Sequence, residues 1–91
     1  MIPENRKPAH PGRILGEYYL EPKGITQTDF AKTLDISLRR LNELVNENRR
    51  MTADTAIRLA EHLGTTAQFW MNLQIAVDLW EAKNERETAG V

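Results

Sequence analysis

Residues 26–45 decide the fold of this chain, and they read T-Q-T-D-F-A-K-T-L-D-I-S-L-R-R-L-N-E-L-V. Two helix-start signals lie in this stretch, because Thr26 and Ser37 are favoured N-cap residues. Each follows an isoleucine, and each has an apolar residue at the fourth helical position, which is the pattern of a hydrophobic staple. The spacing between the two caps leaves room for about two turns of helix and a short turn. The stretch therefore predicts two short helices joined tightly, as in a helix-turn-helix.

Each of these two helices has one apolar face. The positions on those faces are Phe30, Ala31 and Leu34 in the first helix, and Leu41, Leu44 and Val45 in the second. Ala31 is small enough to let two steeply crossing helices approach, where a larger side chain would overpack the contact. Asp35 is the residue expected to form the turn between them.

The opposite face of the second helix is polar. At about 100° per residue, the outward positions are Arg39, Asn42, Glu43 and Asn46, with Ser37 and Leu38 at the leading tip. A recognition helix presents such a face to base edges in the major groove. Arg39 can bind a guanine through two hydrogen bonds, worth about 1–3 kcal/mol of discrimination. Glu43 can accept from a cytosine amino group or orient Arg39, and Leu38 can touch a thymine methyl or belong partly to the core.

Other residues around the motif are expected to contact phosphates. Gln27 and Thr28 begin the first motif helix, where free backbone N–H groups and the helix dipole favour an anion. Arg40, Arg49 and Arg50 flank the outward face and are the expected phosphate ligands, which position the protein without reading sequence. The alternative for the whole face is an ordinary solvated helix surface with an Arg–Glu pair.

The rest of the chain predicts three more helices. One begins near Pro11 and stops near Leu20 or Glu21, ahead of Pro22 and Gly24. A second is capped by Thr52 and ends at Gly64. A third starts with a capping box formed by Thr65 and Gln68, and it extends to about residue 84. This gives an all-α domain of about five helices over residues 10–84, with a flexible arm at 1–9 and a frayed tail at 85–91.

The last helix carries two apolar stripes. The first consists of Phe69, Trp70, Leu73, Ala76, Val77 and Trp80, and the second consists of Met71, Ile75 and Leu79. A terminal helix needs only one apolar face to dock on its own domain, so the other face is expected to meet a partner. We expect a two-fold dimer formed through Trp70, Met71, Ile75, Leu79 and Trp80, with Trp70 or Trp80 anchoring either core or interface. The alternative is that the domain covers both stripes itself.

Three further segments accompany the motif: H-P-G-R-I-L-G-E-Y-Y-L-E-P-K-G-I, T-A-D-T-A-I-R-L-A-E-H-L-G-T and F-W-M-N-L-Q. Together they resemble the HigA or virulence-associated protein I antitoxins, which have an Xre-type, lambda-repressor-like helix-turn-helix, and the resemblance covers residues 10–82. It implies a DNA-binding antitoxin that represses its own operon and neutralises a cognate toxin. Because one such helix reads only a few base pairs, a homodimer on an inverted-repeat operator is also expected. In the resembling repressors a Gln at the place of Gln27 contacts the sugar-phosphate backbone. Their turn residue is usually Gly, and Asp35 departs from this, although Asp tolerates the left-handed conformation better than most residues.

Composition limits the other possibilities. The 91 residues include no Cys, which excludes disulfides and thiolate metal sites. There is no signal sequence or membrane span, so the cytoplasm is the expected location. The net charge is −1, with nine Lys or Arg against seven Asp or Glu in residues 1–50, and three against six afterwards. The acidic second part can serve a different partner from the DNA, and toxins that act on RNA tend to be basic.

An enzyme is the main rival class, and the sequence gives it no support. There is no glycine-rich phosphate loop and no metal-ligand spacing, so no catalytic residue, metal or cofactor is predicted. His10 lies at a helix start and His62 in a last helical turn, where neither needs a catalytic explanation. Two alternatives remain open: a free-standing Xre-type repressor without a toxin, and a protein-binding module that has lost DNA affinity.

Overall fold

The computed structural model describes residues 6–89, with side chains up to residue 87, and this part of the chain is helical without any strand. The elements are α1 (Pro11–Ile14), η1 (Leu15–Leu20), η2 (Glu21–Lys23), α2 (Gln27–Leu34), α3 (Leu38–Val45), α4 (Ala53–Leu63) and α5 (Ala67–Ala89). The prediction of an all-α fold of about five helices is confirmed. None of the described helices has the length and apolarity needed to cross a bilayer.

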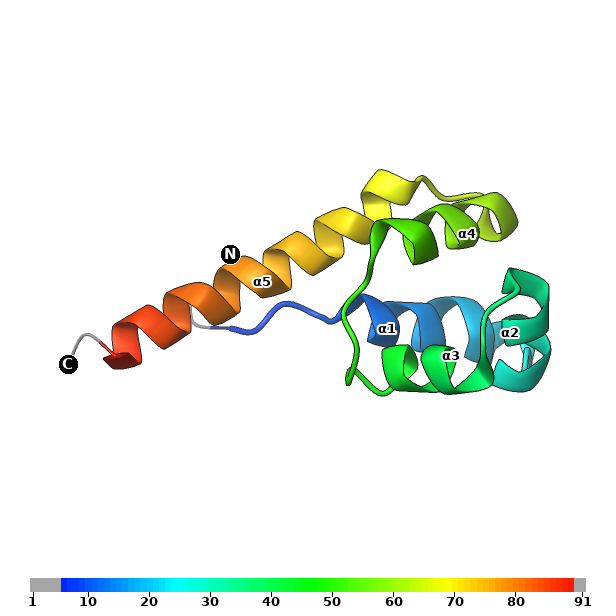
Figure 1. The fold of residues 1–91 in the computed structure, drawn as a ribbon, viewed down its shortest axis with the longest axis horizontal. Coiled ribbons are helices and arrows are strands. Elements are labelled where there is room, and N and C mark those ends of the chain that lie inside the picture. Colours follow the sequence, from blue (N-terminus) through cyan, green and yellow to red (C-terminus); the bar gives the residue numbers. More distant parts are fainter. Residues whose placement is uncertain (1–5, 90–91) are drawn as a thin grey trace.

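The helices up to α4 form a bundle, and α5 extends well beyond it (Figure 1). α4 and the first part of α5 pack together on one side, and α3 lies on the opposite side of the bundle. α1 lies between them and contacts both α3 and α5. The extents of 47 × 27 × 21 Å reflect the projecting part of α5.

Local chemistry explains the starts of α2, α3 and α4. The hydroxyl of Thr26 accepts from the Asp29 N–H at 3.2 Å, and that of Ser37 accepts from the Arg40 N–H at 3.0 Å. Thr52 caps α4 in the same way. Each cap satisfies a backbone donor that the first turn of a helix leaves without a partner. The three N-caps predicted for these helices are therefore confirmed.

The turn between α2 and α3 depends on Asp35. Its φ of 57° and ψ of 48° place it in the left-handed region. Its N–H donates to the Lys32 carbonyl, and the next N–H, that of Ile36, donates to the Ala31 carbonyl. These bonds end α2 within one residue and turn the chain directly into α3, as expected for a helix-turn-helix.

The first helical segment differs from the prediction of a simple helix that stops before Pro22. Its middle part, η1, has π-helical bonding, with the Glu21 N–H donating to the Gly16 carbonyl. The chain then passes through Pro22 in the 3₁₀ turn η2, and this helical segment ends at Gly24, whose φ is 65°. Proline fits there because it lies in the first turn of η2, where its missing N–H breaks no hydrogen bond.

The start and end of α5 also differ from expectation. Thr66, one residue after the predicted cap, accepts from the Phe69 N–H at 3.0 Å. Thr65 instead accepts from the indole N–H of Trp70 at 2.7 Å. At the other end α5 continues to Ala89, five residues past the predicted end, because nothing between residues 84 and 89 breaks a helix. The frayed tail is therefore helical over residues 85–89, and residues 90–91 lie outside the described part.

A close contact between α1 and α3 fixes the position of α3. A Cβ atom added at Gly12 would lie 2.6 Å from the carbonyl carbon of Leu44, and closer still to its oxygen. Only glycine allows two backbones to approach this far. The core around the contact is formed by Leu15, Leu20, Phe30, Ala31, Leu34, Leu41, Leu44, Met51, Ala56, Leu59 and Trp70. Ala31 is buried here as predicted, whereas the contact at Gly12 was not anticipated.

Candidate DNA-binding interface

α3 presents one buried face and one exposed face. Leu41 and Leu44 are buried against the core. Arg39 lies on the other side with 87% of its side chain exposed, and Leu38 at the leading tip is 47% exposed. Ser37, Asn42 and Asn46 are exposed as well. The described part of the chain does not cover this face, so a duplex can approach it.

An ion-pair cluster occupies the centre of the exposed face. The two carboxylate oxygens of Glu43 are shared between two arginines: Oε2 accepts from Arg39 Nε at 3.3 Å, and Oε1 accepts from Arg49 Nε at 3.0 Å and Nη2 at 2.7 Å. Hydrogen bonds from Arg49 and then Arg39 lower the pKa of the Glu43 carboxyl. Glu43 therefore stays ionised, and the cluster of three residues carries one net positive charge.

A second chain of hydrogen bonds connects α3 with the start of α2. The side-chain amide of Asn46 donates to Asn42 at 3.2 Å, and Asn42 donates to the side chain of Gln27 at 3.3 Å. The structure thus brings these three predicted site residues together. Gln27 lies at the N-terminus of α2 as expected, where free backbone N–H groups favour a phosphate. Thr28 is exposed beside it.

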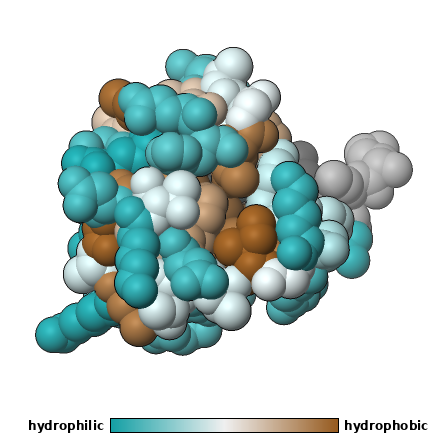
Figure 2. All heavy atoms as spheres, turned by 90° about the vertical axis from the view of Figure 1, so that its right-hand side faces the viewer, coloured by the Kyte–Doolittle hydropathy of each residue, from teal (hydrophilic) through white to brown (hydrophobic). Residues whose placement is uncertain are grey.

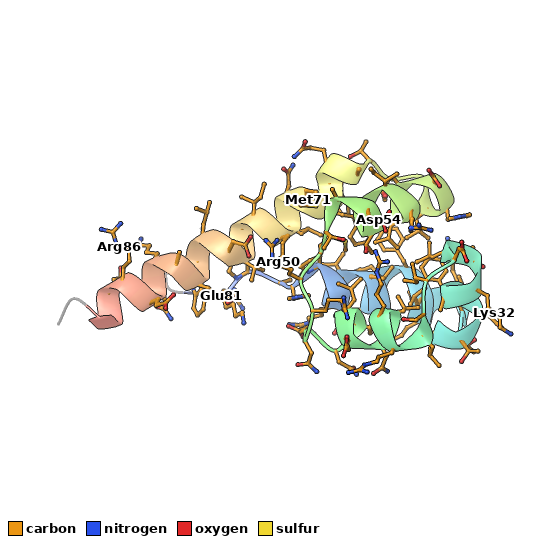
Figure 3. The ribbon with its side chains drawn as sticks, viewed as in Figure 1. Lys32, Arg50, Asp54, Met71, Glu81 and Arg86 are labelled. Atoms are coloured by element: carbon orange, nitrogen blue, oxygen red, sulfur yellow. The ribbon has the colours of Figure 1, made fainter. Side chains whose placement is uncertain are left out.

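Two predicted phosphate ligands have other partners. Arg40 donates to Asp54 at 2.8 Å and to the hydroxyl of Thr55, both on α4. Arg50 pairs with Asp78 of α5 and lies beside that helix (Figure 3). Arg40 therefore connects α3 with α4, and Arg50 ties the connection between α3 and α4 to α5. The structure does not bring these two arginines into the Glu43 cluster.

Arg58 is a structural residue that the sequence did not reveal. Its guanidinium donates to Asp54 at 3.0 Å and to the Leu34 carbonyl at 2.9 Å, so it joins α4 to the end of α2. Asp54 lies on the side of α4 that faces the bundle (Figure 3), and hydrogen bonds from Arg40 and Arg58 lower its pKa. The i,i+4 spacing of Asp54 and Arg58 predicts their pairing. The carbonyl of Leu34 comes from a distant part of the chain, which no local pattern can indicate.

His10 and Gln74 were also missed as structural residues. The buried His10 caps the first helix, because its Nδ1 accepts from the Gly12 N–H at 2.9 Å. Gln74 is buried on α5 and accepts from the Met51 N–H at 2.7 Å, which fixes the connection between α3 and α4 to the last helix. Within the described residues there is no group of three or more His, Asp or Glu side chains suited to a metal ion.

The predicted dimer residues on α5 fall into three groups by exposure. Trp70 has no exposed surface, because it packs against Tyr19 and Phe69, so its prediction as an interface residue is wrong. Met71 and Trp80 are half-buried, and the Lys7 ammonium lies 5.8 Å from the centre of the Trp80 ring. Ile75 and Leu79 are 45% and 66% exposed. Among the described residues, Ile75 and Leu79 of the second predicted stripe are thus the ones left exposed.

The α2 end of the molecule, opposite to the projecting part of α5, has a mostly hydrophilic surface. Seen from the α2 end, hydrophilic side chains dominate, and hydrophobic ones appear as small areas between them (Figure 2). Exposed hydrophobic side chains scattered in this way are normal for soluble domains and indicate no particular partner.

Comparison with known proteins agrees with this geometry. The helix-turn-helix family matches residues 17–70. Virulence-associated protein I of Dichelobacter nodosus is 45% identical over 97% of this chain and 82% of its own length. Antitoxin HigA-1 of Vibrio cholerae is 40% identical over 87% of this chain and 74% of its own length. Among solved structures, the Pseudomonas aeruginosa antitoxin HigA with the higBA promoter is 38% identical, with a TM-score of 0.86 over 91% of this chain and 90% of that chain.

The matches extend over the motif, the helices around it and α5. The chain therefore belongs to the Xre-type helix-turn-helix family, in the group of the HigA antitoxins and virulence-associated protein I.

Proposed function

We propose that this protein is a DNA-binding antitoxin of a type II toxin–antitoxin module, which represses its own operon and neutralises a cognate toxin. The exposed polar face of α3 carries the proposal, because an outward recognition helix is what a helix-turn-helix protein inserts into the major groove. The relative solved with a promoter supports the DNA-binding half. The relatives named as antitoxins support the toxin half.

The contacts with DNA follow from the geometry of the face. α3 enters the major groove, with Arg39 as the reader of a guanine and Leu38 at the leading tip. Gln27 and Thr28 bring the N-terminus of α2 to the phosphate backbone. Arg49, which follows α3, contacts a phosphate from the other side of the face. Asn42 and Asn46 are available for further contacts. This function requires no catalytic group, and it places the protein in the cytoplasm together with the operon it controls.

Dimerisation completes the proposal. One recognition helix reads only a few base pairs, so a two-fold dimer on an inverted repeat is the expected binding unit. Ile75 and Leu79 form the centre of the proposed interface, because they are exposed apolar residues on a helix that extends beyond the bundle (Figure 1). Met71 and Trp80 lie at its margins.

The DNA-binding half is tested with the duplex directly upstream of the gene for this chain. Fluorescence anisotropy is measured for that duplex and for a scrambled duplex of equal length, at several salt concentrations. We expect tighter binding of the upstream duplex by at least about a thousandfold, within the usual range for specific recognition. Equal affinity for the two duplexes would contradict sequence-specific binding.

The toxin half is tested through the gene neighbourhood. The small open reading frame beside this gene is expressed with and without this chain, and cell growth is measured. We expect growth arrest without this chain and normal growth with it, together with co-purification of the two products. If no neighbouring product arrests growth, the protein is a free-standing repressor.

A further inference from the structure

Two roles are expected for Glu43 from the sequence, contacting a base and orienting Arg39, and its surroundings in the structure argue for the second. Its carboxylate accepts three hydrogen bonds from two arginines, one from Arg39 and two from Arg49. A carboxylate has about four acceptor positions, so most of those on Glu43 are occupied. At most one acceptor position therefore remains for a cytosine amino group.

The nitrogen atoms that the pairing with Glu43 leaves free differ between Arg39 and Arg49, and they suit the two arginines to different contacts. Arg39 uses only its Nε, so within the described structure both of its terminal nitrogens remain available. These two nitrogens form the fork that binds a guanine through two bonds. Arg49 uses Nε and Nη2 and keeps Nη1, which suits a single contact with a phosphate oxygen.

Fold stability does not explain the cluster. Arg39 is almost fully exposed and Arg49 is about half exposed, and ion pairs between exposed side chains contribute little to stability. The ion pairs instead restrict the movement of the two arginine side chains. Long arginine side chains lose rotamer freedom when they bind, and fixing them beforehand reduces that cost.

We propose that Glu43 is a positioning residue that does not read a base but holds Arg39 and Arg49 in the geometry that recognises the operator. Its negative charge has a second effect, because it lowers the attraction of this face for any DNA backbone. This charge effect is the same for every duplex, so the gap between specific and non-specific binding comes from the positioning of the two arginines. This inference rests on the proposed DNA-binding function.

The test compares wild type with Glu43→Gln, which is nearly equal in shape but has no charge. Affinity is measured for the upstream duplex and for a scrambled duplex. We expect weaker binding to the upstream duplex and tighter binding to the scrambled one, with a specificity ratio about tenfold lower. Glu17→Gln is the matched control, because Glu17 forms an i,i+4 pair with Arg13 at 3.1 Å outside the motif. This control is expected to keep the wild-type ratio.

A second comparison asks whether Glu43 acts through Arg39. In an Arg39→Gln background, Glu43→Gln should reduce the specificity ratio much less than in wild type, because the residue to be positioned is already absent. Circular dichroism and thermal unfolding check that every variant is folded.

Two outcomes would overturn the proposal. Equal tightening on both duplexes would show that Glu43 acts by charge alone. A loss of discrimination at one cytosine-containing base pair, unchanged in the Arg39→Gln background, would show that Glu43 reads that base. Failure of wild type to distinguish the two duplexes would contradict the proposed function itself, and the same assay reveals it.

Discussion

Gly12 shows how one residue without a side chain sets the position of the recognition helix. The backbone of α1 approaches the Leu44 carbonyl so closely that the space of a Cβ atom is already taken. Any other residue at this position must push α1 away from α3. Because Leu44 belongs to α3, such a shift would also change how the exposed face of α3 is presented.

Gly12→Ala is therefore expected to destabilise the protein by about 2 kcal/mol or more, the cost of overpacking a rigid contact. Urea unfolding measures the change in free energy. Gly16→Ala is the matched control, since its nearest neighbour is a side-chain methyl carbon, Cγ1 of Val45 at 3.2 Å, and not a backbone atom. Alanine also favours a helix over glycine, so the control should stay near wild-type stability. Equal losses in the two variants would contradict this account of Gly12.

His10 makes the stability of the fold depend on pH. Burial lowers the pKa of its imidazole from the ordinary 6.5, with Lys7 acting in the same direction. Glu47, Glu81 and the Arg49 backbone act against this. The neutral ring is also the form whose Nδ1 can accept the Gly12 N–H.

The unfolded chain therefore binds this proton more readily than the folded one. We expect the free energy of unfolding to be highest above pH 7 and to fall as the pH decreases through 6.5. Unfolding by urea between pH 8 and 5 measures the slope. His10→Asn keeps a capping side chain but removes the titration, so its slope should be smaller. An identical slope in wild type and variant would rule out His10 as the cause.

At the scale of elements, local signals predicted α2, α3 and α4 well. Their caps at Thr26, Ser37 and Thr52 depend on contacts within three residues, which a sequence displays directly. The start of α5 was wrong by one residue because Thr65 and Thr66 are both good caps. The Trp70 indole binds the first of them, and this packing contact decides between the two.

The surface arginines were harder to assign from the sequence. Arg40 and Arg50 had the right charge and place in the chain to contact phosphate, yet they pair with Asp54 and Asp78 of other helices. Arg39 and Glu43 lie four residues apart on one helix, so their pairing could be predicted. Spacing along a single helix is visible in a sequence, whereas partners between helices depend on how the helices pack.

Arg49 provides a test of the backbone contacts of the motif. Arg49→Ala should weaken binding to specific and scrambled duplexes alike and reduce the slope of log affinity against log salt by about one unit. The slope is obtained from anisotropy titrations. Arg86→Ala is the control, because Arg86 lies on the projecting part of α5 away from α3 (Figure 3). An unchanged slope for Arg49→Ala would remove it from the interface.

α5 provides a test of the proposed dimer. Leu79→Asp places a charge on the exposed stripe and should give a folded monomer whose operator affinity is about a hundredfold lower, since linked half-sites gain by avidity. Analytical ultracentrifugation measures the mass. Ile57→Asp is the matched control, as Ile57 is a similarly exposed residue on α4. A dimer that persists in Leu79→Asp would place the interface elsewhere.

At the scale of the molecule, charge and shape suggest two separate regions. The exposed face of α3 carries a small positive excess on a chain whose net charge is −1, so local arrangement matters more than total charge for DNA binding. α5 projects away from that face (Figure 1), and its apolar residues Ile75 and Leu79 are exposed within the described part of the chain. One molecule can thus bind DNA through α3 while α5 is engaged by a second copy.

Methylation protection tests whether the exposed face of α3 enters the major groove, because dimethyl sulfate modifies the guanine N7 in that groove. On the upstream duplex, wild type should protect guanines in two half-sites about one helical turn apart. Arg39→Ala, at concentrations that still saturate the duplex, should lose protection at one guanine in each half-site. Binding without any protection of N7, or a protection pattern unchanged in Arg39→Ala, would contradict the account.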